Sequence, residues 1–164
     1  MNPLANTMTR ALLLIAIIGL YACDSSTDKA DVNKPGAALS AADHITVSNA
    51  WIRATAPGQT VTGAFLTLTN SSETAYTLIS ASFNGAGAVE IHETSMDEGV
   101  MRMRKVSHVD IPANGFAELK PGSFHIMLID LETEMKPGLT EMLTLTFSDD
   151  SQKTVEATVG SPSD

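Results

Sequence analysis

From residue 45 onward the chain is made of short segments in which apolar and polar residues alternate. An alternation of period two sends successive side chains to opposite faces of a β-strand, so each segment has one face for a core and one for water. Residues 142–147 show this pattern, with Leu143, Leu145 and Phe147 on one face and threonines on the other. No long segment of this region has the 3.6-residue period of an amphipathic helix, so we predict an all-β fold.

The predicted strands are short and are separated by turns rich in Asn, Gly, Pro and Asp, which favour tight reversals of the chain. They cover residues 64–69, 76–83, 88–93, 100–106, 116–119, 124–130, 142–147 and 154–159. Many short strands with turn signals between them are typical of a β-sandwich or barrel. A length of 164 residues fits one such domain with appendages, and we place the domain at residues 44–160 and a short tail at 161–164.

The first 22 residues have the layout of a secretory signal peptide. A single basic residue, Arg10, precedes the apolar run at residues 11–20. That run is too short to span a hydrocarbon layer of about 30 Å, which needs about 20 apolar residues in a helix. We therefore predict export and removal of residues 1–22, with an uncleaved membrane anchor as the alternative.

The predicted signal peptide runs into the sequence Leu-Tyr-Ala-Cys at residues 20–23, which resembles the box at which bacterial lipoproteins are cleaved and lipidated. The resemblance implies that Cys23 carries the lipid and that Asp24 favours retention in the inner membrane. The alternative is ordinary secretory cleavage, which leaves Cys23 as an unpaired thiol in an oxidising compartment. Residues 23–43 hold almost nothing to bury, so we predict a lipidated N-terminus and a flexible tether for a periplasmic domain.

Composition and motifs exclude several classes of function. The formal net charge of −9 disfavours nucleic acid as a partner. Cys23 is the only cysteine, so one chain can form neither a disulfide nor a cysteine-based metal site. A blue-copper centre needs a thiolate beside two histidines, and Cys23 precedes the tether. No Gly-x-Ser-x-Gly, phosphate-loop or His-Glu-x-x-His motif is present, so we do not expect an enzyme.

Two predicted strands place metal-binding atoms on the face opposite their apolar residues. In residues 124–128 the apolar side chains take one face, so His125 and Met127 share the other. In residues 88–93 the same alternation turns His92 away from the core. Imidazole nitrogen and thioether sulfur both bind copper, so these strands offer candidate ligands.

A third predicted strand, residues 100–104, alternates methionine with arginine. Met101 and Met103 therefore share one face, and a core strand would not carry two arginines on the other. Thioether sulfur is soft and uncharged, so it favours Cu(I) over zinc, magnesium or calcium. The alternative is that these methionines fill gaps in a core, which is their usual role. Because histidines accompany them, we predict a shared metal site, with Met101 and Met96 as auxiliary donors.

Three other side chains are candidates for the site but have simpler expected roles. His44 lies at the start of a strand and His108 in a loop, where each is expected to be a solvated or capping residue. A lone tryptophan beside a strand usually anchors a core, so we predict a core position for Trp51.

The spacing of four donors resembles that of a known family. Ten residues separate His92 from Met103, and twenty-one separate Met103 from His125. One residue separates His125 from Met127. This pattern is similar to the His-x10-Met-x21-His-x-Met signature of the periplasmic copper chaperones called PCuAC, and the resemblance extends over residues 45–159.

The resemblance implies a cupredoxin-like Greek-key β-sandwich or barrel that holds Cu(I) through His92, Met103, His125 and Met127. It also implies delivery of copper to a membrane partner, either the CuA-bearing subunit of cytochrome c oxidase or an assembly factor for it. Two alternatives stay open for the function. One is a copper buffering or resistance protein with the same site, and the other is a metal-free, tethered sandwich that binds other proteins.

Overall fold

The computed structural model describes residues 39–160, and the predicted signal peptide, Cys23, most of the tether and the tail lie outside them. Within residues 39–160 a short helix, α1 (Ala41–His44), precedes ten strands. The strands are β1 (Ile45–Arg53), β2 (Thr62–Asn70), β3 (Tyr76–Phe83), β4 (Ala86–Asp97), β5 (Val100–Lys105), β6 (Val109–Ile111), β7 (Phe116–Leu119), β8 (Phe124–Leu131), β9 (Thr140–Phe147) and β10 (Gln152–Gly160). No helix in this part of the chain is long and apolar enough to cross a membrane.

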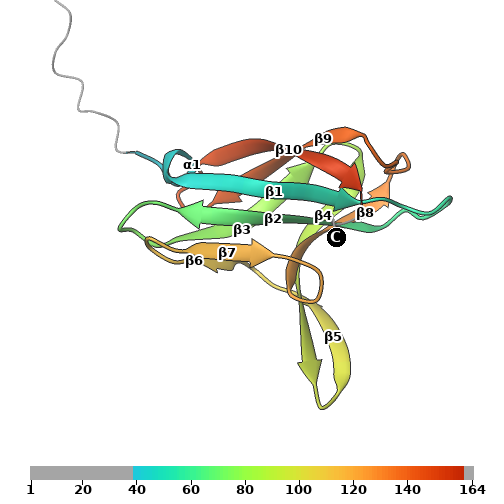
Figure 1. Cartoon of the computed structure of the whole chain (residues 1–164), viewed down its shortest axis with the longest axis horizontal. Helices are drawn as coiled ribbons and strands as arrows, with labels where there is room; N and C mark the ends of the chain where they lie inside the picture. The colour runs from blue at the N-terminus through green and yellow to red at the C-terminus, as the bar shows by residue number, and fades with distance from the viewer. Residues whose placement is uncertain (1–38, 161–164) are drawn as a thin grey trace, which may run out of the picture. The chain divides into compact units, whose positions relative to one another are not determined.

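The strands form one continuous sheet in the order β5-β4-β8-β2-β1-β10-β9-β3-β6, and β7 also pairs with β2 (Figure 1). β2 is central, because it pairs with β1 along one side and with β8 and then β7 along the other. All of these pairs are antiparallel except β1 with β10. β3 and β4 are far apart in this order yet contact each other, so the sheet folds over and encloses a core.

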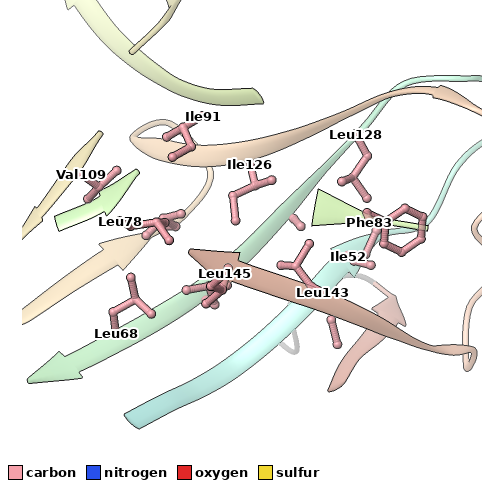
Figure 2. Close-up of a cluster of buried hydrophobic side chains, with 14 of the residues drawn as sticks. Ile52, Leu68, Leu78, Phe83, Ile91, Val109, Ile126, Leu128, Leu143 and Leu145 are labelled. Carbon is pink, nitrogen blue, oxygen red and sulfur yellow. The ribbon is translucent and has the colours of Figure 1, made fainter. Parts of the chain in front are cut away.

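Alternate residues of the strands build that core. Leu143, Leu145 and Phe147 of β9 are completely buried, whereas Thr144 and Thr146 between them are only half-buried. Figure 2 labels ten of the core side chains, which come from β1, β2, β3, β4, β6, β8 and β9. The period-two pattern therefore predicts the buried face correctly, and the all-β fold class is confirmed.

All eight predicted strands are present, with ends that differ by at most four residues. Two further strands, β1 and β6, are not among the predicted segments. β1 contains a register shift between Ser48 and Trp51, with Asn49 at a φ of 52°, so its apolar residues change phase partway along the strand. β6 has only three residues, too few for an alternation to be recognised.

β4 extends four residues past its predicted end and turns directly into β5. Its last residues, 94–97, pair only with β5, because the ladder between β4 and β8 ends at Glu93. The β4–β5 hairpin therefore projects from the sandwich, as Figure 1 shows, and every residue of β5 is exposed. At its turn Glu98 and Gly99 both have positive φ, 49° and 80°, a two-residue geometry that matches the twist of paired strands.

Candidate metal centre

Three neighbouring strands, β5, β4 and β8, carry the predicted donor residues. His92 of β4 and His125 of β8 are direct cross-strand partners, so their side chains leave the sheet on the same side. Their ring centroids are 5.9 Å apart. The adjacent residues Ile91 and Ile126 point the other way and are buried in the core.

The orientation of the His125 ring is fixed by the backbone. The residue is only 4% exposed, and its Nδ1 lies 2.9 Å from the carbonyl oxygen of Ser123. A carbonyl oxygen only accepts hydrogen bonds, so Nδ1 carries the proton and the lone pair of the neutral ring lies on Nε2. Nε2 is buried and has no hydrogen-bond partner among the described residues.

His92 has the opposite tautomer. Its Nε2 lies 2.8 Å from one oxygen of Glu90, whose other oxygen accepts a 2.8 Å hydrogen bond from Nζ of Lys105. The contact with His92, followed by that with Lys105, holds the pKa of Glu90 below its ordinary value. The ionised carboxylate therefore accepts a hydrogen bond from the Nε2–H group, and Nδ1 carries the lone pair of the neutral ring. That Nδ1 is likewise buried without a partner in residues 39–160.

Two buried nitrogens with free lone pairs thus lie on adjacent rings. Leaving a buried polar atom unpaired costs about 1–3 kcal/mol, so two of them side by side indicate an electron-pair acceptor. Histidines that bind metals commonly donate their other ring N–H to a carboxylate or a backbone carbonyl, which fixes the tautomer. Glu90 and Ser123 provide these two kinds of partner, so the histidine pair fits a metal ion.

The two predicted methionine donors lie near this pair. Met127 follows His125 by two residues on β8, and Met103 of β5 is the cross-strand partner of Thr94, two residues from His92 on β4. Met103, Met127 and His125 line one cavity of about 650 Å³. His92 is not among the residues that line this cavity, but its ring lies beside that of His125. The structure therefore brings the four residues into one region of the sheet.

The two auxiliary candidates lie farther out on the hairpin. Met101 lines the same cavity, whereas Met96 does not. The two are cross-strand partners beside the turn, and each is 67% exposed. Met103 is 55% exposed. His125 is thus buried and His92 partly buried, whereas the methionine side of the site on β5 is open to solvent.

An aromatic stack lies next to His125 and is not among the site residues predicted from the sequence. Phe65 of β2 has its ring centroid 6.3 Å from that of His125, Trp51 stacks on Phe65 at 4.4 Å, and the Arg53 guanidinium lies 5.4 Å from the Phe65 centroid. The predicted core position of Trp51 is therefore wrong. Ile52 is the buried residue here, and its neighbours on either side point to the face that carries the site. The alternation over residues 51–53 is the signal that places Trp51 there.

The other two histidines of the described residues do not line the cavity. His44 is the last residue of α1 and stacks with Tyr76, at 6.3 Å between centroids. His108 is exposed and hydrogen-bonds to Ser107. Within residues 39–160 no three His, Cys, Asp or Glu side chains gather where they could hold a metal ion. The soft donors that line the cavity with His125 are the sulfurs of Met101, Met103 and Met127.

Solved structures identify the class of the domain. The chain matches the copper-bound PCuAC domain from PmoF2 with a TM-score of 0.63 and 22% identity, over 75% of this chain and 97% of that one. It matches the solution structure of Cu(I)-DR1885 from Deinococcus radiodurans with a TM-score of 0.61 and 30% identity, over 77% of this chain and 84% of that one. The fold is therefore the cupredoxin-like fold of PCuAC domains, as predicted from the resemblance.

Sequence comparison gives the family. Residues 45–159 match the family described as "Putative lipoprotein LpqE-like", and the chain belongs to this LpqE-like family. It is 32% identical over 154 residues to "Putative lipoprotein Lxx21020" of Leifsonia xyli subsp. xyli, covering 93% of this chain and 89% of that protein. It is 38% identical over 96 residues to "Uncharacterized protein RP573" of Rickettsia prowazekii, covering 58% of this chain and about half, 53%, of that protein.

Proposed function

We propose that this protein is an exported copper carrier that binds one Cu(I) ion through Nδ1 of His92, Nε2 of His125 and the sulfurs of Met103 and Met127. The observation that carries the proposal is the pair of buried, unpartnered ring nitrogens on adjacent strands. Hydrogen bonds on the far side of each ring fix these lone pairs. Both methionines line the cavity beside them.

The donor set favours Cu(I) over other ions. Two neutral imidazoles and two thioethers are soft or borderline ligands without charge, and thioether sulfur selects Cu(I). Structural zinc sites normally use thiolates, and calcium and magnesium require oxygen ligands. Support also comes from the matched structures, since DR1885 was solved with Cu(I) and the PmoF2 domain with copper.

The arrangement suits transfer of the ion. Neutral ligands can be replaced one at a time by those of a partner, without leaving an uncompensated charge behind. Because Met103 is 55% exposed and His125 only 4%, a partner reaches the sulfur on β5 first. The methionines therefore release the ion before the histidines do.

The proposed place of action is the outer side of the inner membrane. The predicted signal peptide and the lipidation of Cys23 would anchor the protein there, and the tether would let the domain reach a neighbour. Both the family description and that of the Leifsonia relative name lipoproteins, which supports the anchor. We propose a copper-accepting membrane protein as recipient, namely the CuA subunit of cytochrome c oxidase or an assembly factor for it.

Competition for Cu(I) against a chromogenic chelator tests the binding. We expect the chain to bind one Cu(I) tightly, and His125→Ala to weaken the affinity by about 100-fold, equivalent to about 2.7 kcal/mol. His108→Ala is the matched control, because His108 is an exposed histidine outside the cavity, and its affinity should equal that of the wild type. Equal affinities of the two variants would contradict the site. A wild-type chain that never competes would favour the metal-free interaction domain.

Deletion of the gene separates delivery from buffering. Loss of oxidase activity that is restored by the wild-type gene, but not by the His125→Ala gene, is the result expected for delivery. Copper sensitivity with normal oxidase activity would show instead that the protein buffers copper.

A further inference from the structure

The β4–β5 hairpin ends in a pair of methionines that the proposed site does not need. Met96 and Met101 are direct cross-strand partners, so their side chains leave the hairpin on the same side. Each is 67% exposed, and the pair lies where the hairpin projects from the sandwich (Figure 1). A side chain that stays two-thirds exposed gains little from burial, so the usual packing role of methionine does not explain the pair.

Ion pairs between β4 and β5 lie on the opposite face of the hairpin. Arg102 contacts Asp97 at 3.1 Å, and Arg104 contacts Glu93 at 2.6 Å. Because side chains alternate along a strand, these four residues lie on the face away from the methionines. One face of the hairpin thus carries ion pairs between its two strands, and the other presents the uncharged sulfurs of the methionines to solvent.

Cross-strand pairs on the sulfur-bearing face form a row that leads from the turn to the imidazoles. In order from the turn, the pairs are Met96–Met101, Thr94–Met103 and His92–Lys105. Successive pairs are two residues apart, which is about 7 Å along a strand. Long, flexible side chains can contact each other over this spacing, so the sulfur of Met101 can approach that of Met103. Both residues line the cavity that also contains His125.

We propose that Met96 and Met101 form an outer Cu(I) site, through which the ion reaches and leaves the inner, histidine-containing site. This inference rests on the proposed function. Thioethers are soft ligands that suit Cu(I), and both are accessible to a donor or acceptor protein without exposing the buried His125.

Transfer along the row is a ligand exchange. The bond from copper to the sulfur of Met103 forms as the bond to the sulfur of Met101 breaks, and the bond to the sulfur of Met96 breaks as the inner imidazole nitrogens bind. The ion remains Cu(I), and no proton moves. The outer site has no imidazole and is open to water, so it binds copper more weakly than the inner site. An ion taken up at the turn therefore moves inward, and a second ion occupies the outer site only after the inner one is filled.

The test is an anaerobic Cu(I) titration of the full chain labelled with ¹³C at the methionine methyl groups. In the wild type, the first equivalent shifts the signals of Met103 and Met127, and a second, weaker equivalent shifts those of Met96 and Met101. The double variant Met96→Leu/Met101→Leu loses the second equivalent, because leucine preserves volume and removes the sulfur. The control Met142→Leu keeps both equivalents, since Met142 is 52% exposed but lies on β9, which pairs with neither strand of the hairpin.

The two proposals fail in different ways. A wild type that binds one equivalent and never a second, or a double variant that still binds two, overturns the outer site and leaves the proposed function standing. Loss of the first equivalent in the double variant also overturns the outer site, because Met96 or Met101 then belongs to the inner one. A first equivalent that leaves the signals of Met103 and Met127 unchanged overturns the proposed function itself.

Discussion

At the scale of single residues, hydrogen bonds on the far side of each imidazole determine which nitrogen is free for a ligand. The tautomer of His92 depends on the hydrogen bond to the Glu90 side chain, which Lys105 also contacts. The tautomer of His125 depends on the backbone carbonyl oxygen of Ser123, which no side-chain substitution removes. The two halves of the proposed site therefore differ in how mutation can affect them, and Glu90 is the residue at which the tautomer can be tested.

Glu90→Ala is expected to weaken Cu(I) binding by about tenfold, because outer partners of metal-binding histidines typically contribute 10–100-fold to affinity. Without the carboxylate, the proton of the His92 ring is no longer held on Nε2, so the lone pair is no longer held on Nδ1. Glu90→Gln should recover most of the affinity, since its amide oxygen can still accept a hydrogen bond from the Nε2–H group of His92. Chelator competition measures all three proteins, with Glu118→Ala as a control that removes a surface carboxylate paired to Lys120. An Ala variant as tight as the wild type would show that the tautomer does not depend on Glu90.

The sequence predicts part of the candidate site. Alternation within single strands was enough to turn His92 and His125 away from the core. It could not reveal Ser123, because a hydrogen bond to a backbone carbonyl depends on geometry and leaves no signal in residue type. The general preference of tryptophan for core positions predicts the wrong place for Trp51, because Ile52 is the residue that the strand buries here.

At the scale of elements, side chains of the β9–β10 turn hold the short helix α1 against the sheet. Oδ2 of Asp149 accepts a 2.6 Å hydrogen bond from the N–H of Ala41, and Oγ of Ser151 accepts one of 3.0 Å from the N–H of Ala42. Burial acts to raise the pKa of Asp149, but the hydrogen bonds from Ala41 and Ser151 outweigh it and hold that pKa below its ordinary value.

Asp149→Ala is therefore expected to lower the free energy of unfolding by about 1 kcal/mol at pH 7, a modest value because the carboxylate is exposed. Since the folded-state pKa lies below that of the unfolded chain, this stabilisation is present above about pH 4 and is lost as the pH falls through the folded value. Urea unfolding at pH 7 and pH 2 measures it, and the difference between the two proteins should be smaller at pH 2. Glu156→Ala, which removes an exposed carboxylate of β10, should stay within about 0.5 kcal/mol of the wild type. A difference as large at pH 2 as at pH 7 would contradict the role of the charge.

Strands were predictable where one of their faces meets the core. Residues 94–97 of β4 were missed because that part of the strand pairs only with β5 and projects from the sandwich, so no core selects apolar residues at every second position. β1 was missed for a different reason, because the bulge between Ser48 and Trp51 shifts its apolar residues from odd to even positions. Both irregular elements border the candidate site, so the sequence predicts the core more fully than the surroundings of the site.

At the scale of the whole molecule, the proposed copper binding would be coupled to folding. The proposed ligands come from β4, β5 and β8, and residues 92 and 125 become neighbours only when the ladder between β4 and β8 forms. An unfolded chain cannot hold the four donor groups together, so an ion held at the proposed site would bind the native state and stabilise it by mass action.

Cu(I) is therefore expected to raise the melting temperature of the chain. At a free concentration of 100 times Kd the stabilisation is about 2.7 kcal/mol, which for a domain of this size corresponds to roughly 10 °C in anaerobic scanning calorimetry. The shift should be smaller at pH 5 than at pH 7.5, because protons compete with the ion for imidazole nitrogens, whose reference pKa is about 6.5. His92→Ala/His125→Ala should show no shift at either pH, and Zn²⁺ should stabilise the wild type far less than Cu(I) because thioethers are poor zinc ligands. An equal shift in the double variant would mean that copper stabilises the fold from somewhere other than the histidine pair.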